Sequence, residues 1–371
     1  MKASVKRKLD HIRVCLEKDV EHVKLKTGFD DVHLVHACLP ELNLDDVSLE
    51  AEFLGRRFAA PIIISALTGG PELASLINRS LAEAAQRLNI PLEIGSQRPA
   101  LEDPSLKPAF KEVRAVAPQA FIVANVGAVQ VVKGGPSLVE EAVDMIEADA
   151  VAVHLNPLQE ALQPEGRADF KGVLEALREL SRRVGVPLIV KEVGCGVARE
   201  EAALLEEAGV SAIDVAGGGG TSWASIEAYR ALSVGDEAGF SLGMTFRDWG
   251  IPTAVSIVEA REATRLPIIG SGGVRSGLDA AKAIALGADL AGMALPLLRP
   301  ALVGAWAVAE TLERVMKELR LAMFLTGSRS VEDLKGTRVV LTGLTAEWLK
   351  ARGFEASKLA SRRLAVAKDS H

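Results

Sequence analysis

Eight short apolar runs, each followed by glycine or polar residues and then by a helical pattern, recur along the 371-residue chain. Amphipathic stretches such as 73–89 and 173–185 separate them. The runs begin at residues 61, 90, 120, 150, 186, 211, 266 and 290. Continuous apolar runs that alternate with helices are typical of parallel strands buried on both faces. Eight such units predict an α/β fold, a closed (β/α)8 TIM barrel.

The segments outside the eight units predict additions to one barrel domain. In residues 1–60 we expect an N-terminal arm and then a cap, in which LNLDDVSLEAEFLGRRFAAP forms a small β-meander over the barrel bottom. Residues 61–371 would form the barrel, with extra helical pattern at 218–265 and an extra helical C-terminal piece from Val303. We see no linker or low-complexity segment, so we expect one domain overall.

Composition restricts the partners and the location. The formal net charge of −6 gives no reason to expect a nucleic acid or an anionic membrane surface as partner. Cys15, Cys38 and Cys195 lack the spacing of a disulfide framework or a thiolate metal site. No window approaches the roughly 20 apolar residues of a membrane span, and the first residues lack the apolar core of a signal peptide. We therefore expect a cytoplasmic protein.

Small or polar groups stand at the end of every apolar run. A parallel barrel gathers the carboxyl ends of its strands around one mouth, where ligands bind. The groups at the eight ends are Thr68-Gly69-Gly70, Ser96-Gln97-Arg98, Asn125-Val126-Gly127, His154 to Glu160, Lys191-Glu192, Gly217 to Thr221, Ser271-Gly272-Gly273 and Met293-Ala294. The pattern predicts a ligand site at the mouth.

The seventh loop, GSGGVRSGLDAAKAIALGAD, predicts a phosphate site. Glycines between a strand and a helix let backbone N–H groups approach an anion at the helix N-terminus, and the loops after strands seven and eight are the common phosphate site of such barrels. Gly272 to Arg275 stand at that position. The alternative is a tight turn without a ligand.

Basic and amide side chains predict a second anion in the same mouth. Ser96 and Arg98 are two residues apart, as are His154 and Asn156, and positions i and i+2 share a face in extended backbone. Their donors suit a diphosphate. Lys191 could stabilise negative charge on a bound ring or a developing anion, and its alternative is a solvated lysine at a strand end.

A further basic cluster lies in the N-terminal arm, where Arg7 and Lys8 precede His11. Its alternative is a charged, disordered tail. The pair Gln159-Glu160 follows Pro157, and its alternative is a helix start that caps the next turn.

With these residues assembled, the sequence resembles the type 2 isopentenyl-diphosphate isomerases, flavoenzymes of isoprenoid synthesis, over nearly the whole chain. The matching motifs are R-K-x-x-H at 7–11, T-G-G at 68–70, G-S-Q-R at 95–98, A-N-x-G at 124–127, H-L-N-P-x-Q-E at 154–160, V-K-E at 190–192, G-G-T-x-W at 219–223 and G-S-G-G-x-R-S-G at 270–277. H-L-N-P-x-Q-E together with S-Q-R is very specific, whereas many FMN barrels share the glycine loops.

The resemblance implies a role for each matching position. FMN would contact Ala66, Leu67, Thr68, Ser96, Asn125, Lys191, Ala216, Thr221, Gly272, Gly273, Val274, Arg275, Ala294 and Leu295. The substrate diphosphate would meet Arg7, Lys8, His11, Ser96, Gln97, Arg98, His154, Asn156 and Gln159. Glu160 would be the Mg²⁺ ligand. One departure is Ala216, where many relatives carry Ser or Thr.

The implied reaction interconverts isopentenyl and dimethylallyl diphosphate by adding a proton at one carbon and removing one at another. Gln159, Lys191 and His154 are the expected catalytic residues. An amide is a poor base, so we hypothesise that reduced FMN supplies a proton at N5 or N1 while Gln159 relays the other. NADPH or another reductant would activate the flavin. Relatives form tetramers and octamers, so we expect a homo-oligomer.

Four other kinds of protein compete with this interpretation. A 2-hydroxy acid oxidase carries a His before the glycine pair after strand six, where this chain has AGGGGTSW. An inosinate dehydrogenase needs a nucleophilic Cys in that loop, and none of the three cysteines lies there. A flavin-free prenyl transferase barrel would bind no FMN. A scaffold without activity would not need polar residues at all eight strand ends.

Overall fold

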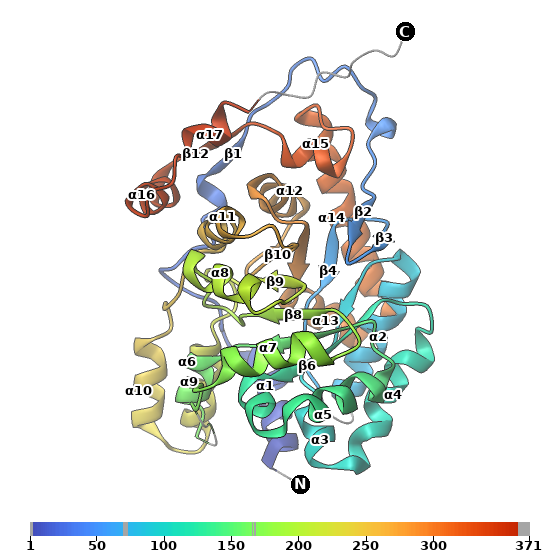
Figure 1. Cartoon of the computed structure of the whole chain (residues 1–371), viewed down its shortest axis with the longest axis vertical. Coiled ribbons are helices and arrows are strands. Elements are labelled where there is room, and N and C mark those ends of the chain that lie inside the picture. Colours follow the sequence, from blue (N-terminus) through green and yellow to red (C-terminus); the bar gives the residue numbers. More distant parts are fainter. Residues whose placement is uncertain (1–2, 70–72, 165, 167, 363–371) are drawn as a thin grey trace.

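The computed structural model describes residues 3–69, 73–164, 166 and 168–362, and its centre is a closed barrel of eight parallel strands (Figure 1). The strands are β4 (Ile62–Ile64), β5 (Leu92–Glu93), β6 (Ile122–Gly127), β7 (Ala150–His154), β8 (Leu188–Lys191), β9 (Ala212–Asp214), β10 (Ile268–Ser271) and β11 (Leu290–Met293). They follow each other around the ring in chain order, and β11 pairs with β4 to close it. Each predicted run contains one strand, so the barrel prediction is confirmed.

An outer layer of helices covers the strands. It contains α2 (Leu73–Leu88), α4 (Lys107–Val116), α5 (Ala128–Ile146), α7 (Val173–Arg183), α8 (Arg199–Glu207), α11 (Thr253–Ala263), α12 (Gly277–Leu286) and α14 (Ala305–Leu325). Helix α2 shows why the sequence folds in this way, because Ile77, Leu81 and Ala84 are buried at spacings of three and four residues. Within the described residues, no helix is both long and apolar enough to cross a membrane.

Five further helices lie in the loops that follow strands. They are α3 (Arg98–Glu102), α6 (Pro157–Leu162), α9 (Trp223–Ser233), α10 (Glu237–Thr245) and α13 (Leu295–Val303). Helices α9 and α10 account for the extra helical pattern before α11. Loop helices at the carboxyl ends of strands add walls to the barrel mouth.

The N-terminal arm is a helix, α1 (Ala3–Glu17), rather than a disordered tail. It packs against α9 and α13, and Arg7 and His11 are buried in that contact region. A 3₁₀ turn, η1 (Phe29–Asp31), and a short strand, β1 (Val32–Leu34), follow.

The predicted meander at the barrel bottom is a single hairpin, β2 (Ala51–Phe53) with β3 (Arg56–Phe58). A 3₁₀ turn, η2 (Leu44–Asp46), takes the place of the third strand, because Asn43 and Asp46 form a capping box. The hairpin does cover the bottom: Phe58 packs edge-on against Phe121, just before β6, at a centroid distance of 5.5 Å.

The C-terminal region is mostly helical, as predicted, but it also holds a strand that the sequence analysis missed. After α14 come α15 (Val331–Lys335), β12 (Val339–Leu341), α16 (Gly343–Ala351) and α17 (Ser357–Ala360). Strand β12 pairs antiparallel with β1, so the two ends of the chain form one small sheet outside the barrel (Figure 1).

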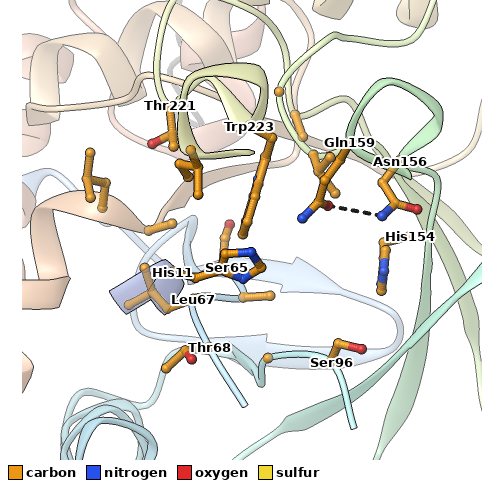
Figure 2. Close-up of a pocket in the computed structure, with 18 of the residues that line it drawn as sticks. His11, Ser65, Leu67, Thr68, Ser96, His154, Asn156, Gln159, Thr221 and Trp223 are labelled. Carbon is orange, nitrogen blue, oxygen red and sulfur yellow. Dashed lines mark hydrogen bonds between the residues drawn. The ribbon is translucent and has the colours of Figure 1, made fainter. Parts of the chain in front are cut away.

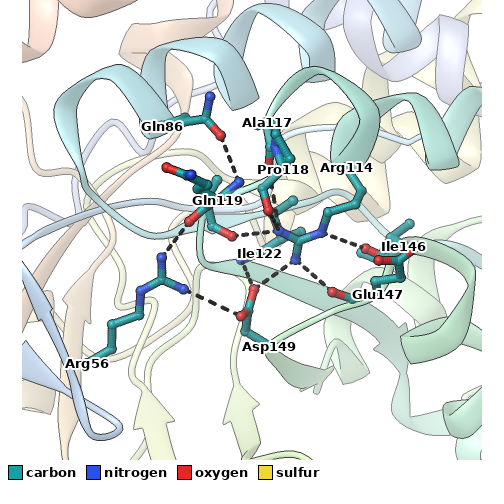
Figure 3. Close-up of polar contacts among 11 residues, drawn as sticks. Arg56, Gln86, Arg114, Ala117, Pro118, Gln119, Ile122, Ile146, Glu147 and Asp149 are labelled. Atoms are coloured by element: carbon teal, nitrogen blue, oxygen red, sulfur yellow. Dashed lines mark hydrogen bonds and ion pairs between the residues drawn. The ribbon is translucent and has the colours of Figure 1, made fainter.

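A polar network joins α4 to the starts of β6 and β7 at the barrel bottom (Figure 3). The Arg114 guanidinium donates to the carbonyl oxygens of Ala120 (2.8 Å) and Glu147 (2.6 Å) and to Oδ2 of Asp149 (2.8 Å). Asp149 Oδ2 also accepts from the N–H of Ile122 at 2.9 Å. The Arg114 guanidinium therefore provides hydrogen-bond donors for backbone carbonyls and a carboxylate that lie next to the starts of β6 and β7.

Candidate functional site

A large cavity opens at the carboxyl ends of the barrel strands (Figure 2). Protein atoms leave about 1390 Å³ free there, including the open mouth. All eight strand ends contribute to its wall, and α1 closes one side with Arg7, Lys8 and His11. With the open mouth included, the volume exceeds the roughly 300–1,000 Å³ of a typical single-ligand pocket.

Most of the predicted site residues line this one cavity. They are Arg7, Lys8, His11, Ala66, Leu67, Thr68, Ser96, Arg98, Asn125, His154, Asn156, Gln159, Glu160, Lys191, Ala216, Thr221, Gly272, Gly273, Arg275, Ala294 and Leu295. Gly70 of the T-G-G motif lies outside the described residues. Segments as distant as residues 7 and 295 therefore meet at one place.

Gln97 and Val274 are not among the side chains that line the cavity, so these two predictions need correction. Gln97 is 0% exposed. Its Nε2 donates to the carbonyl of Ala142 (2.8 Å), and its Oε1 accepts from the N–H of Asn125 (3.0 Å). Val274 is buried in the apolar core. Gln97 therefore lies outside the cavity and holds the backbone of Asn125 in place.

The expected extended backbone around Ser96 and Arg98 is also wrong. Gln97 has φ −82° and ψ 2°, and α3 begins at Arg98. Both side chains still reach the cavity. Arg98 Nε donates to Glu102 at 2.7 Å, and its Nη1 lies 3.9 Å from Glu160 Oε1.

Lys191 is buried at the end of β8 and is not a solvated lysine. Its Nζ lies 3.2 Å from Asp214 Oδ2 and donates to the carbonyl of Glu192 at 2.9 Å. Burial opposes the charge, but Asp214 and Glu93 outweigh burial and raise the pKa of Lys191. A permanent cation therefore stands in the cavity wall.

Glu93 is a second buried acid near Lys191 that the sequence analysis did not select. Its Oε1 accepts from Asn125 Nδ2 at 2.6 Å, and its Oε2 accepts from the N–H of Ala66 at 3.4 Å. Burial, with a contribution from Asp214, raises the pKa of Glu93 to about 7, while Lys191 opposes the shift. The signal was a carboxylate inside the apolar run IPLEIGS.

His154 ends β7 and is neutral. Its Nδ1 lies 2.8 Å from Asn125 Oδ1. Burial is the largest cause that lowers the pKa of His154, to about 3, and Lys8 and Lys191 add to it. His154 thus does not contribute a positive charge to an anion site at neutral pH.

Gln159, in the first turn of α6, is held at both ends of its amide, and Figure 2 shows the contact with Asn156. Its Oε1 accepts from Asn156 Nδ2 (3.0 Å), and its Nε2 donates to Glu227 Oε1 (3.0 Å). Asn156 makes no side-chain cap for α6. The side chain of Gln159 is therefore aimed at the cavity and does not cap the helix.

Glu227, on α9, accepts hydrogen bonds from several residues of the site, and the sequence did not predict this role. Its carboxylate also accepts from His11 (3.0 Å) and from Arg230 (2.5 Å). Burial would raise the pKa of Glu227, but His11, Arg230 and Gln159 together lower it to about 2. No local sequence pattern marks Glu227 as a site residue, because His11 and Gln159, its two partners in the cavity wall, lie 216 and 68 residues away.

The basic residues of α1 and α3 form the anion-binding side of the cavity. Desolvation in the wall lowers the pKa of Lys8 to about 7, and the charges of Arg7 and Arg98 contribute to this shift, against Glu227. The three basic side chains repel one another, and a bound anion would offset this repulsion.

The glycine loop after β10 leaves no room for side chains. Gly272 and Gly273 have φ of 103° and 75°, and a Cβ on Gly272 would overlap the carbonyl oxygen of Gly217. The predicted contact with the N-terminus of α12 is wrong in detail, because Asp279 accepts from the N–H groups of Arg275 and Ser276. An anion here must use the loop itself and the Arg275 side chain.

The cavity also contains buried polar atoms without a hydrogen-bond partner among the described residues. They include His11 Nδ1, Ser65 Oγ and Thr68 Oγ1. Such atoms are costly unless a ligand or water satisfies them. The described residues contain no group of three or more His, Cys, Asp or Glu that could hold a metal, so a metal beside Glu160 would need oxygens from a ligand.

Comparison with known proteins shows which families this chain resembles in sequence. The family model for FMN-dependent dehydrogenase matches residues 141–341. The isopentenyl-diphosphate delta-isomerase of Methanosarcina barkeri is 50% identical over 94% of this chain and 95% of its own length. The corresponding protein of Methanothrix thermoacetophila is 49% identical over 97% of this chain and 99% of its own length.

Solved structures support the fold. A mandelate oxidase mutant with a C4a-OH-FMN adduct gives a TM-score of 0.62 at 20% identity and covers 91% of this chain and 99% of its own. At this identity the likeness shows the shared barrel alone.

Proposed function

The chain belongs to the isopentenyl-diphosphate delta-isomerase family, in its FMN-dependent type 2 branch, and we propose how its cavity carries out the reaction. The enzyme interconverts isopentenyl and dimethylallyl diphosphate with FMN in isoprenoid biosynthesis. Relatives at about half identity over nearly the full chain set it apart from the oxidases, with which it shares only the barrel.

FMN would be held by residues at the ends of β4, β5 and β6, and its phosphate by the glycine loop after β10. The fit is supported by Gly272, Gly273 and Arg275 of this loop, which line the cavity, and by Thr68 Oγ1, a buried atom that needs a partner. Lys191 places a fixed positive charge against the ring. Reduced FMN, once bound, supplies the acid–base chemistry that amide side chains cannot supply.

The substrate diphosphate lies against Arg7, Lys8 and Arg98. Asn156 and Ser96 stand in the same wall and provide neutral donors. The net charge of the chain is −6, but these three basic residues make the potential in this part of the cavity positive. Glu160 would hold Mg²⁺, and oxygens of the diphosphate and of water would complete its ligands.

Gln159 faces the reacting carbons and moves one proton. Asn156 and Glu227 fix its amide, and Gln159 lines the cavity. Oε1 would accept the proton that leaves the substrate and release it to the acid–base group that supplies the proton added at the other carbon, so that Gln159 and Glu227 end each turnover as they began. The second proton, added at the other carbon, balances the reaction, which has no net redox change.

The single observation that carries this proposal is the meeting of Lys191, Gln159 and the basic residues of α1 in one cavity. The test is an absorbance titration of the purified protein with FMN, followed by an isomerase assay under reducing conditions. Uptake of one FMN per chain and formation of dimethylallyl diphosphate are expected. A protein that takes up no FMN would favour the flavin-free prenyl transferase alternative and refute the proposal.

We further propose NADPH as the physiological reductant, a homo-oligomeric enzyme and a cytoplasmic location. Exposed Val303 and Trp306, beside each other where α13 meets α14, support a contact between subunits. The cysteines are all free, which supports a reducing compartment.

A further inference from the structure

Three side chains connect the barrel interior to the cavity through hydrogen bonds. Asn125 Nδ2 donates to Glu93 Oε1 at 2.6 Å, and Asn125 Oδ1 lies 2.8 Å from His154 Nδ1. Glu93 and Asn125 are 3% and 2% exposed, so water cannot replace either contact. The chain runs from β5 through β6 to β7, three neighbouring strands.

The donors and acceptors in this chain can be paired in only one way when Glu93 is ionised. A carboxylate only accepts, and both oxygens of Glu93 accept here, one from Asn125 and one from the N–H of Ala66. The amide of Asn125 must then turn its nitrogen to Glu93 and its oxygen to His154. An oxygen facing Nδ1 requires a proton on Nδ1.

His154 carries only one ring proton, since its pKa is lowered to about 3. If that proton is on Nδ1, then Nε2 carries a lone pair. The second nitrogen of a histidine is set by the bond that the first one makes. Because His154 lines the cavity, a ligand would meet an acceptor at Nε2 and not a donor.

We propose that Glu93 is a positioning residue that sets the tautomer of His154 through Asn125, so that His154 presents an unprotonated Nε2 to the cavity. The consequence for binding is specific. Nε2 cannot donate to a fully ionised diphosphate oxygen, and it instead accepts from a ligand N–H or O–H group. Glu93 thus determines whether Nε2 of His154 donates or accepts a hydrogen bond, although Glu93 does not contact His154.

Burial raises the pKa of Glu93 to about 7, so the ionised form required for this pairing predominates above about pH 7, where the tautomer is to be read. Lys191, on β8, lowers the pKa of Glu93, whereas Asp214, on β9, raises it. The Asn125 amide and the Ala66 N–H both stabilise the charge. The pairing therefore depends on Lys191 remaining cationic beside the two acids.

The test reads the tautomer directly, without reference to the isomerase reaction. FMN-loaded protein with ¹⁵N-labelled histidine is examined by long-range ¹H–¹⁵N NMR, and His154 is assigned from the signals lost in His154→Asn. Wild-type protein is expected to show a protonated Nδ1 and an unprotonated Nε2. A protonated Nε2 in the wild type would overturn the proposal whatever the enzyme catalyses.

Glu93→Gln tests the coupling. Its amide has one acceptor oxygen for two donors, so Asn125 can reverse and donate to Nδ1, and the proton moves to Nε2. We expect a shift of about tenfold in the ratio of the two tautomers, equivalent to ~1.4 kcal/mol. An unchanged ratio would refute the role of Glu93. Glu192→Gln, at a buried acid that bonds other backbone N–H groups, is the matched control and should leave His154 as in the wild type.

A double variant keeps the proposal testable if Glu93→Gln alone folds poorly. When Glu93→Gln is combined with Asn125→Asp, the introduced amide donates to the introduced carboxylate, which accepts from His154 Nδ1–H. The double variant is therefore expected to restore the wild-type tautomer. A protonated Nε2 in this variant would contradict the pairing rule on which the proposal rests.

Discussion

The Nζ of Lys191 lies 3.2 Å from Oδ2 of Asp214 on the neighbouring strand of the barrel. Both side chains are buried, so the attraction is only weakly screened. Glu93 adds a second acid nearby. The lysine is thus held in place and kept charged before any ligand arrives, as electrostatic preorganisation requires.

Removal of this cation should weaken flavin binding. Lys191→Met keeps most of the side-chain volume but removes a charge that faces the ring, and it leaves Asp214 without its partner. We expect the FMN dissociation constant to rise about 10- to 100-fold, for the loss of ~1.5–3 kcal/mol. Quenching of flavin fluorescence in a titration measures it. Wild-type affinity would make Lys191 a structural residue only.

Shortening Gln159 should reduce turnover and leave the flavin in place. Gln159→Asn withdraws the amide from both Asn156 and Glu227, so the oxygen no longer reaches the reacting carbon. We expect kcat to fall by about 10²–10³-fold, in the range for a lost proton-transfer group. The control is Gln86→Asn, at the barrel bottom, where Gln86 accepts from the N–H of Gln119. Equal kcat in the two variants would argue against the role of Gln159.

Glu160 and Glu102 offer a matched pair for the metal. Both lie near Arg98, but only Glu160 lines the cavity. Glu160→Gln should raise the Mg²⁺ concentration for half-maximal activity about tenfold or more, because one of the few carboxylate ligands is lost. Glu102→Gln should leave the Mg²⁺ titration unchanged. Identical titrations for both variants would remove Glu160 as the ligand.

Lys8 should make substrate binding depend on pH. Its pKa in the free enzyme is about 7, and a bound diphosphate would raise this pKa by supplying the opposite charge. Binding above about pH 7 must therefore take up a proton, and affinity should fall by up to ~10-fold per pH unit. Calorimetry in buffers of different ionisation enthalpy measures the proton uptake.

Lys8→Arg gives the control for this dependence. Arginine stays charged at every relevant pH, so the proton uptake between about pH 7 and 9 should disappear while binding persists. If the variant and the wild type take up the same number of protons, another group is responsible.

The Arg114 network should matter for stability and not for the site. Arg114→Ala leaves the backbone carbonyls of Ala120 and Glu147 without their guanidinium donor and removes one of the donors to the Asp149 carboxylate (Figure 3). We expect a loss of ~2–4 kcal/mol in the free energy of unfolding, measured by denaturant titration, with FMN affinity unchanged. Changing the exposed Arg79, which pairs with Glu83 on the same helix, to Ala should leave the free energy of unfolding close to that of the wild type, because exposed ion pairs contribute little.

The barrel could be predicted because its signal is local and repeated. A run such as AFIVANVG, when it alternates with helices, is typical of a parallel strand buried on both faces, and eight such units suffice to close the ring. Strand β12 gave no such signal. It has three residues, lies between helices, and is a strand only because β1, near the other end of the chain, is its partner.

Site residues that stand at the ends of strands were predicted from the sequence. Site residues that reach the cavity only through the packing of distant segments were missed. Lys191 and Asn125 stand at strand ends. Glu227 lies inside α9, and only the fold brings it to Gln159 and His11. Gln97 was wrong for the opposite reason: it stands between two cavity residues, but the turn into α3 directs its side chain away from the cavity.

The central claim is that a flavin and a diphosphate act together in one cavity without net redox change. The most direct measurement counts molecules of dimethylallyl diphosphate formed from isopentenyl diphosphate per reduced FMN, under anaerobic conditions and without further reductant. We predict many turnovers per flavin, with the flavin still reduced at the end and no product with oxidised FMN. No product from the reduced enzyme, or one flavin oxidised for each product formed, would contradict the account.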